Sequence, residues 1–363
     1  MPVVVTSLGM VSSVGLDVVT ACASIRAGLR RPKVVSQFMV DSGEFEEAPL
    51  TAYPVSPFTD GFTGSGKWLR LAVECLRDLV LYGSLPDAQH PGFWQRTALI
   101  AAGPYLNDDR YGWADDADGT VLYGTYLHPL LDAMQGPVPK PLCSMVCRAH
   151  ATFAHAVLRA IQHIEQKQVD RVVILGADSY LDVETVRWLQ EHRRLKDGAS
   201  PSGLIPGEAC AAILLEDEAL ARQRGARIEA HLGHIEVAQE DCEFNGDKVG
   251  SGAKLTECIV GVAKQIAQQP FAGDLYLDLN GERWKSAWWG NAQVLMQRDV
   301  DFNRSRLILA SDSLGETGAA SGVVAMCCAV RSFQRGYASG GASLICGLSD
   351  HGEIGVLAMT ASA

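Results

Sequence analysis

The sequence predicts an α/β fold in which helices cover a sheet and one arrangement of elements occurs twice. Short apolar runs alternate with segments of helical spacing, and this alternation is typical of a sheet with helices on its faces. The order of strand, small-residue turn and helix recurs in the second part of the chain, which suggests two duplicated halves. The chain has 363 residues, of which 47% are hydrophobic, so it can bury the core that two such halves share.

The first predicted half covers residues 1–225 and contains several continuous apolar runs bounded by turn residues. Such runs indicate buried strands. Strands are predicted at 3–11, 96–103, 170–178 and 209–217, and helices at 16–28, 67–82 and 150–166. Two segments, 31–66 and 104–140, are predicted to be loop insertions at the surface, the first because it is rich in Pro, Ser, Gly and Asp and the second because it carries the acidic run at 107–119.

The second predicted half covers residues 226–363 and repeats the order of the first half. Strand-like segments are predicted at 226–239, 274–281, 306–316, 342–348 and 355–361, and helices at 254–268 and 318–336. Because both halves bury apolar faces, we expect them to form one compact unit rather than two independent domains.

Composition and charge exclude several classes of function. The 42 acidic residues exceed the 31 Lys and Arg residues, and the net charge of −11 argues against nucleic acid or an anionic membrane as the main partner. There is no run of eighteen apolar residues and no basic segment followed by a long apolar stretch at the start, so we expect a cytoplasmic protein without a membrane span. The ten cysteines, several of them in apolar runs, are expected to be free thiols.

Several motifs along the chain resemble one enzyme family. The chain opens with VVVTSLGMVSSVG at 3–15, continues with DRVVILGADSY at 170–180, and has GEACAAILLE at 207–216 followed by RGARIEA at 224–230 and GETGAASG at 315–322. In this order they resemble the motifs of the β-ketoacyl-acyl carrier protein synthases. The resemblance implies a thiolase-like five-layered αβαβα fold. It also implies a homodimer, or a heterodimer with a related synthase.

The resemblance implies where a Cys-His-His active site would lie. His150 stands at the position of the family's nucleophilic Cys, Asn280 at the position of the first His, and Glu316 at the position of the second. Cys147 lies three residues before His150, about one helical turn away. The family's lysine before the second His and its G-F-G-G loop near the end of the chain also have no counterpart, because Ser-Asp-His-Gly at 349–352 replaces that loop.

These replacements remove the chemistry that the family needs. Condensation requires a thiolate that accepts an acyl group, and an imidazole at position 150 does not form the same stable thioester. The two histidines donate hydrogen bonds to a developing enolate. Asn280 retains one donor, but a carboxylate at Glu316 would repel the enolate. The sequence therefore predicts a catalytically inactive, β-ketoacyl synthase-like pseudoenzyme.

Two functional hypotheses follow from these residues. The first is a binding, scaffold or accessory subunit whose partner is an active synthase, a carrier protein or a secreted bacterial effector; here His150 and Glu316 form an ion pair that fills an inactive pocket. The alternative is an active acyltransferase or thioester hydrolase with a rearranged site that uses His150, with Glu316 as its orienting carboxylate, or Cys147 as a displaced nucleophile. Neither hypothesis includes a cofactor or a metal site.

One aromatic cluster follows Asn280 closely. Trp284, Trp288 and Trp289 lie in ERWKSAWWGN. They are predicted to plug the mouth of the pocket, to contact a partner, or to pack in the core.

Overall fold

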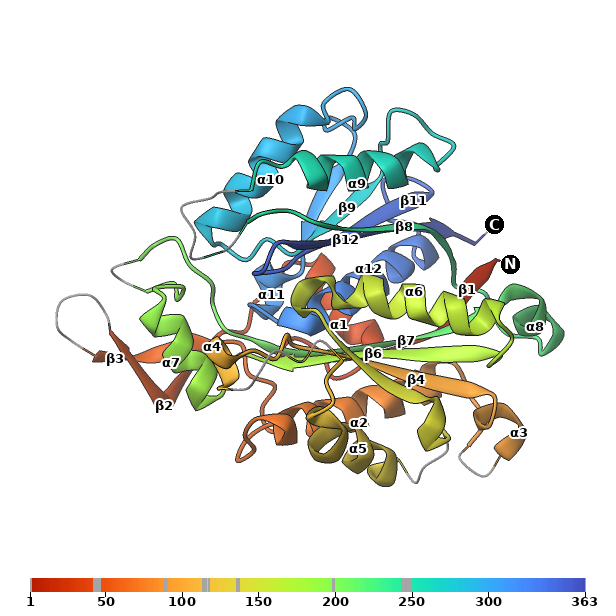
Figure 1. Cartoon of the computed structure of the whole chain (residues 1–363), viewed down its shortest axis with the longest axis horizontal. Coiled ribbons are helices and arrows are strands. Elements are labelled where there is room, and N and C mark those ends of the chain that lie inside the picture. The colour runs from red at the N-terminus through yellow and green to blue at the C-terminus, as the bar shows by residue number, and fades with distance from the viewer. Residues whose placement is uncertain are drawn as a thin grey trace.

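The computed structural model describes residues 2–41, 47–87, 90–112, 116, 118–134, 138–197, 200–242, 244 and 250–362. Within these residues the chain forms a large mixed sheet with helices on its faces (Figure 1), as the sequence predicts. None of the helices in the described part is long and apolar enough to cross a membrane.

The main sheet has ten strands. Their order from edge to edge is β10–β9–β11–β12–β8–β1–β7–β6–β4–β5. The strands are β1 (Val3–Ser12), β4 (Thr97–Gly103), β5 (Cys143–Cys147), β6 (Arg171–Ser179), β7 (Glu208–Asp217), β8 (Ala230–Gln239), β9 (Asp274–Leu277), β10 (Arg306–Leu309), β11 (Ala342–Leu348) and β12 (Glu353–Ala361).

The strand order shows an internal repeat. Read outward from the middle of the sheet, the first half runs β1–β7–β6–β4–β5 and the second runs β8–β12–β11–β9–β10. In both halves the first two pairings are antiparallel and the last two are parallel. The halves meet where β1 pairs with β8 at only two positions, Val4 with His231 and Val5 with Ala230. The prediction of two duplicated halves is confirmed at the level of sheet topology.

Helices form three layers, one on the outer side of each half and one between the two halves (Figure 1). One outer layer contains α2 (Ser65–Tyr82) and α5 (His128–Ala133), and the other contains α9 (Ala253–Lys264) and α10 (Arg283–Leu295). The central layer contains α1 (Val18–Arg26), α6 (Thr152–Glu165) and α12 (Ser321–Gln334). The remaining helices and helical turns are α3 (Pro91–Trp94), α4 (Asp108–Tyr111), η1 (Tyr123–Leu127), η2 (Lys140–Leu142), η3 (Ala149–Ala151), α7 (Val183–Glu191), α8 (Glu218–Gln223), α11 (Ser311–Leu314) and η4 (Gly318–Ala320).

Each helical layer has its own apolar core, because strand side chains alternate between the faces of the sheet. In β4, Ile100 faces the central core and Leu99 faces the outer core under α2 and α5. A strand covered on both faces must be apolar at every position. This requirement explains why β7, which is buried along its whole length, reads as a continuous apolar run in the sequence.

The structure corrects the prediction of surface loops at 31–66 and 104–140. The first segment contains two paired antiparallel strands, β2 (Lys33–Asp41) and β3 (Glu47–Ala52). The apolar residues of β2 do not alternate with polar ones, since the pairing is irregular between Val35 and Met39, and most of its side chains are exposed. The second segment contains α4, η1 and α5. Residues 42–46, 113–115, 117 and 135–137 of these segments lie outside the described residues.

Candidate functional site

The candidate site lies in the central layer, where the first turns of α6 and α12 meet. In the first half the chain leaves β5, makes the turn η3 and enters α6. In the second half it leaves β10, passes α11 and η4, and enters α12. His150 lies in η3 and Glu316 lies two residues before η4. Each half therefore contributes one predicted site residue at the start of its central helix.

The structure brings His150, Glu316 and Asn280 together. The His150 Nε2 atom lies 2.8 Å from Glu316 Oε1, and both side chains are buried, with exposed fractions of 1% and 3%. The Asn280 amide donates a hydrogen bond to Glu316 Oε2. The backbone N–H of Gly318 donates to Glu316 Oε1 at 2.7 Å. Glu316 is thus the buried centre of a hydrogen-bond network.

Arg194 extends this network toward two further carboxylates. Its guanidinium makes two hydrogen bonds with Glu282, at 2.6 and 2.8 Å, and one with Asp350 Oδ2 at 2.7 Å. The Asn280 amide also donates to Glu282 Oε2 at 2.8 Å. Arg194, Glu282 and Asp350 are buried, and Asn280 is partly buried. The guanidinium therefore compensates the charge of two carboxylates that have little contact with water. Asn280 links this cluster to Glu316.

A second buried cation lies at the carboxyl ends of β9 and β11. The Lys285 ammonium of α10 donates to Asp278 Oδ2 at 2.9 Å, and the Leu348 N–H donates to the same oxygen at 2.9 Å. Lys285 and Asp278 are both buried. An ion pair without contact with water stabilises a fold only if its remaining donors and acceptors are satisfied, and the Leu348 N–H supplies one of these bonds.

Asp178 closes the network at the end of β6. Its carboxylate accepts hydrogen bonds from the backbone N–H groups of Ala319, at 3.0 Å, and Ser179, at 2.8 Å. The Arg110 guanidinium lies 3.8 Å away. Burial nevertheless raises the pKa of Asp178 to about 6, because its cost outweighs the arginine and the two backbone donors. The backbone N–H groups just before α12 thus donate hydrogen bonds to two carboxylates, those of Glu316 and Asp178.

The electrostatic balance explains the protonation of His150. Burial and the nearby Lys285 would lower the pKa of His150, but the charge and hydrogen bond of Glu316 outweigh them and raise it. Burial would raise the pKa of Glu316, but His150 and Lys285 hold it well below its usual range. Both shifts favour the charged pair, an imidazolium at His150 and a carboxylate at Glu316. The other ring nitrogen, Nδ1, lies 4.0 Å from Asp350 Oδ1, beyond hydrogen-bond distance.

A raised histidine pKa makes stability depend on pH in one direction. The contribution of the His150–Glu316 pair is fully present below about pH 6.5, the ordinary value for histidine, and is lost as the pH rises through the raised pKa. We expect the difference in free energy of unfolding between the wild type and His150→Gln to be larger at pH 6 than at pH 9. Urea unfolding at both pH values measures this difference. A difference that grows with pH would contradict the ion pair.

Cys147 lies on the opposite face of the sheet from His150. It is the last residue of β5, and its side chain packs in the outer core under α2 and α5. The three-residue spacing therefore spans a strand end, not one helical turn. Burial, together with nearby Asp116 and Asp178, holds the pKa of this thiol far above its usual range. The thiol is fully buried and protonated, and all ten cysteines are free.

The aromatic cluster packs in the core of the second half. Trp288 and Trp289 belong to the apolar core between α10 and the sheet, and Trp288 Nε1 donates to Glu240 Oε2 at 3.0 Å. Lys285 is the residue of this helix that reaches the site network. The described residues contain no group of three His, Cys, Asp or Glu side chains arranged to hold a metal ion.

The donors that an enolate would need are already used. Asn280 donates to both Glu282 and Glu316, and the Gly318 N–H donates to Glu316. An oxyanion hole requires donors aimed at a vacant position where negative charge develops. Here a resident carboxylate accepts those hydrogen bonds. The arrangement favours a stable, closed polar core over transition-state stabilisation.

Sequence reasoning missed the charged residues around this centre. Arg194, Lys285 and Asp278 come from separate segments, and none belongs to a short motif. One signal could have found two of the carboxylates, because Asp278 and Asp350 follow closely after parallel strands β9 and β11. Polar residues at the carboxyl ends of neighbouring parallel strands gather at one edge of a sheet.

Comparison with known proteins finds similar solved structures but no match by sequence. No family model matches the chain, and no curated protein matches it. The structure is similar to the ketosynthase from module 6 of the bacillaene synthase of Bacillus subtilis 168, with a TM-score of 0.77 and 11% identity over 100% of this chain and 72% of that chain.

Two further solved structures come from assemblies of several components. One is described as a type II PKS acyl-carrier protein in complex with its ketosynthase bound to the hexaketide; it has a TM-score of 0.77 and 14% identity, over 100% of this chain and 99% of that chain. The other is the ishigamide ketosynthase/chain length factor, with a TM-score of 0.71 and 16% identity over the same shares. The fold of this chain is therefore the thiolase-like fold of the ketosynthases.

Proposed function

We propose that this protein is a catalytically inactive ketosynthase-fold subunit that acts by binding other proteins. The observation that carries this proposal is the hydrogen-bond network around the buried Glu316 carboxylate. The His150 ring, the Asn280 amide and the Gly318 N–H are all hydrogen-bonded to it. A condensing enzyme needs a thiolate that substrate can reach and free donors for an oxyanion. The residues that meet at the start of α6 and α12 supply neither.

The alternative, an acyltransferase or thioester hydrolase that uses Cys147 or His150, has less support. The Cys147 thiol is buried in the outer core, and its raised pKa leaves it protonated at neutral pH. His150 is paired with Glu316, which favours the imidazolium form, and an imidazolium has no lone pair with which to attack a thioester.

Intact-protein mass spectrometry after incubation with acyl- and malonyl-thioesters tests catalysis. We expect no acyl adduct and no thioester turnover in the wild type, in Cys147→Ala or in His150→Ala. An adduct that disappears only in Cys147→Ala would establish a displaced nucleophile and overturn the proposal. An adduct that disappears only in His150→Ala would support acyl transfer through the imidazole.

Partner binding is supported by the neighbours and by the sheet edges. One neighbour is named as a ketosynthase in complex with an acyl-carrier protein and another as a ketosynthase/chain length factor. In this chain the main sheet ends at β5 and β10, and each outer strand leaves one edge without a strand partner among the described residues. An open strand edge is a template for pairing with another chain. We propose as partner a second copy, a related synthase, a carrier protein or a secreted effector.

Sedimentation velocity tests the self-association part of this proposal. At micromolar concentration we expect the mass of two copies. A single copy at every concentration would rule out a homodimer. Mixing with a ketosynthase and with an acyl-carrier protein would then test the heterologous partners directly.

A further inference from the structure

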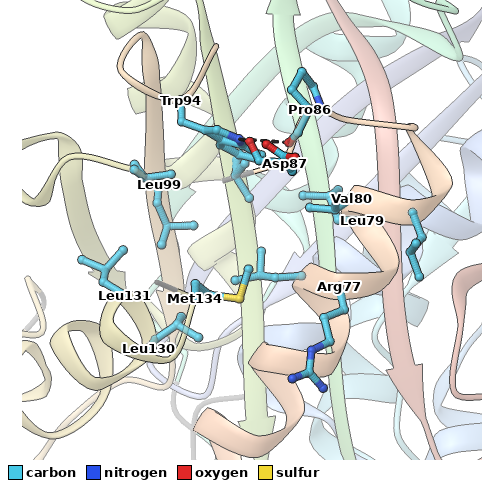
Figure 2. Close-up of a pocket in the computed structure, with 14 residues that line it drawn as sticks. Arg77, Leu79, Val80, Pro86, Asp87, Trp94, Leu99, Leu130, Leu131 and Met134 are labelled. Carbon is cyan, nitrogen blue, oxygen red and sulfur yellow. Dashed lines mark hydrogen bonds between the residues drawn. The ribbon is translucent and has the colours of Figure 1, made fainter. Parts of the chain in front are cut away.

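An apolar pocket lies between α2, α5 and the sheet in the outer layer of the first half (Figure 2). Its volume is about 450 Å³. Side chains of Leu130, Leu131 and Met134 line it from one side and those of Leu79 and Val80 from the other. Cavities of about 300–1,000 Å³ hold small ligands in proteins, and an apolar cavity of only about 150 Å³ already binds benzene.

This pocket is separate from the His150 network because the sheet lies between them. Leu99 of β4 and Val173 of β6 line the pocket and point to the outer core. Their neighbours Ile100 and Val172 point to the central core, on the side of α6 and α12. A ligand in the pocket therefore cannot contact His150, and the inference goes beyond the proposed function.

Among the described residues, the interior of the pocket offers no free polar group to a ligand. Its one interior polar atom with a defined bond, Trp94 Nε1, donates to the backbone carbonyls of Pro86 and Asp87 at 3.0 and 2.9 Å (Figure 2). The other interior side chains are aliphatic or Met. A polar group buried without a hydrogen bond carries a large free-energy cost, so the buried part of the ligand must be hydrocarbon.

The rim carries two charged side chains, Arg77 and Asp87, and one exposed apolar side chain, Leu81. Arg77 and Leu81 lie four residues apart on α2, so they share one face of the helix. The Leu81 side chain is 78% exposed. The Arg77 side chain is 62% exposed, and of its five N–H donors one bonds to Glu74 at 2.5 Å. A carboxylate at the rim would complement the charge of this guanidinium.

We infer that this pocket binds the alkyl chain of a single-chain fatty acid, with the carboxylate at the rim beside Arg77. The same chain could arrive as a free acid or as an acyl ester, and only the free acid carries the charge that Arg77 complements. The wall residues Leu79, Leu99, Leu130 and Leu131 are buried, and the volume of about 450 Å³ is that of a small-ligand site.

Isothermal titration calorimetry of the full chain with dodecanoic acid, methyl dodecanoate and dodecanol tests the inference. We expect saturable binding of one acid per chain with a negative heat-capacity change, and weaker binding of the ester and the alcohol. Leu130→Trp fills the pocket and is expected to weaken binding of all three by about tenfold or more. Arg77→Gln is expected to weaken the acid by about two- to fivefold and to leave dodecanol unchanged.

A control variant tests whether the acid binds in this pocket and not elsewhere on the protein. Val294→Trp places the same bulk at an exposed position of α10 in the other half, and we expect it to leave binding unchanged. If Leu130→Trp does not fold, judged by its circular dichroism and thermal midpoint, Met134→Trp replaces it.

Three outcomes would overturn the inference. The first is that the folded wild type does not bind the acid at all. The second is unchanged binding in a folded pocket-filled variant. The third is that Leu81→Asp converts a two-copy assembly into single copies while no acid binds, which would make the pocket an interface between copies.

Discussion

Replacing Arg194 with methionine is expected to lower the free energy of unfolding by about 3–5 kcal/mol. The substitution removes the cation that bonds to both Glu282 and Asp350. Among the described residues, it leaves these two buried carboxylates with only the Asn280 amide and the charges of His150 and Lys285 to stabilise them. It also removes the guanidinium that stacks 4.7 Å from the Trp188 ring and 4.3 Å from the Phe244 ring. Urea unfolding at pH 7, followed by circular dichroism, measures the loss.

A matched control separates this effect from the loss of any arginine. Arg222→Met removes an exposed pair with Glu218 one helical turn away, and we expect the unfolding transition to change little. The loss of stability is also expected to depend on pH. Burial alone would raise the pKa of Asp350, but Arg194 and His150 hold it below its usual range. The stability that Arg194 provides is present above the ordinary pKa of 3.8 and is lost as the pH falls below it. An Arg194→Met variant as stable as the wild type at pH 7 would contradict the network.

Replacing Lys67 with methionine is expected to have an effect of similar size, about 3–5 kcal/mol. Lys67 Nζ lies 2.8 Å from Glu208 Oε1, and the two residues have exposed fractions of 5% and 0%. The second oxygen of Glu208 has no hydrogen-bond partner among the described residues. Without Lys67 this carboxylate would be fully desolvated and unpaired. Thermal and urea unfolding of Lys67→Met measure the loss.

A double variant distinguishes the cost of an orphaned charge from the value of the pair. Replacing both partners of a buried ion pair with apolar residues is often nearly neutral, whereas removing one partner is not. We therefore expect Lys67→Met/Glu208→Met to be more stable than Lys67→Met alone. Equal stability of the two variants would contradict a large cost from the unpaired Glu208 carboxylate.

Much of the sheet could be predicted from the sequence because of where the strands lie. β6 and β7 have helices on both faces, so nearly every residue must be apolar, and the two strands stand out as continuous runs. β2 and β3 form a separate, mostly exposed pair, and the apolar residues of β2 do not alternate regularly with polar ones. The helix α10 was missed because polar residues are scattered along it and its buried face includes a charged residue, Lys285.

The candidate site could be predicted only through the family resemblance. Nothing in the spacing of His150, Asn280 and Glu316 indicates that they meet, since His150 and Glu316 are 166 residues apart. Arg194, Lys285 and Asp278 could not be found in this way, because they lie outside the family motifs and are joined only by the tertiary fold. The partner of a buried charge can be identified from the tertiary structure but not from the neighbouring residues in the sequence.

The shared central layer has a consequence for the order in which the chain is made. The helix α12 packs on β7 and β6 of the first half as well as on β11 and β12 of the second. While residues 321–334 are still being synthesised, the emerging first half exposes the apolar sheet face that α12 will cover. Exposed faces of this kind make nascent chains prone to aggregation. We expect the first half to fold only after α12 has left the ribosome, and to depend on chaperones until then.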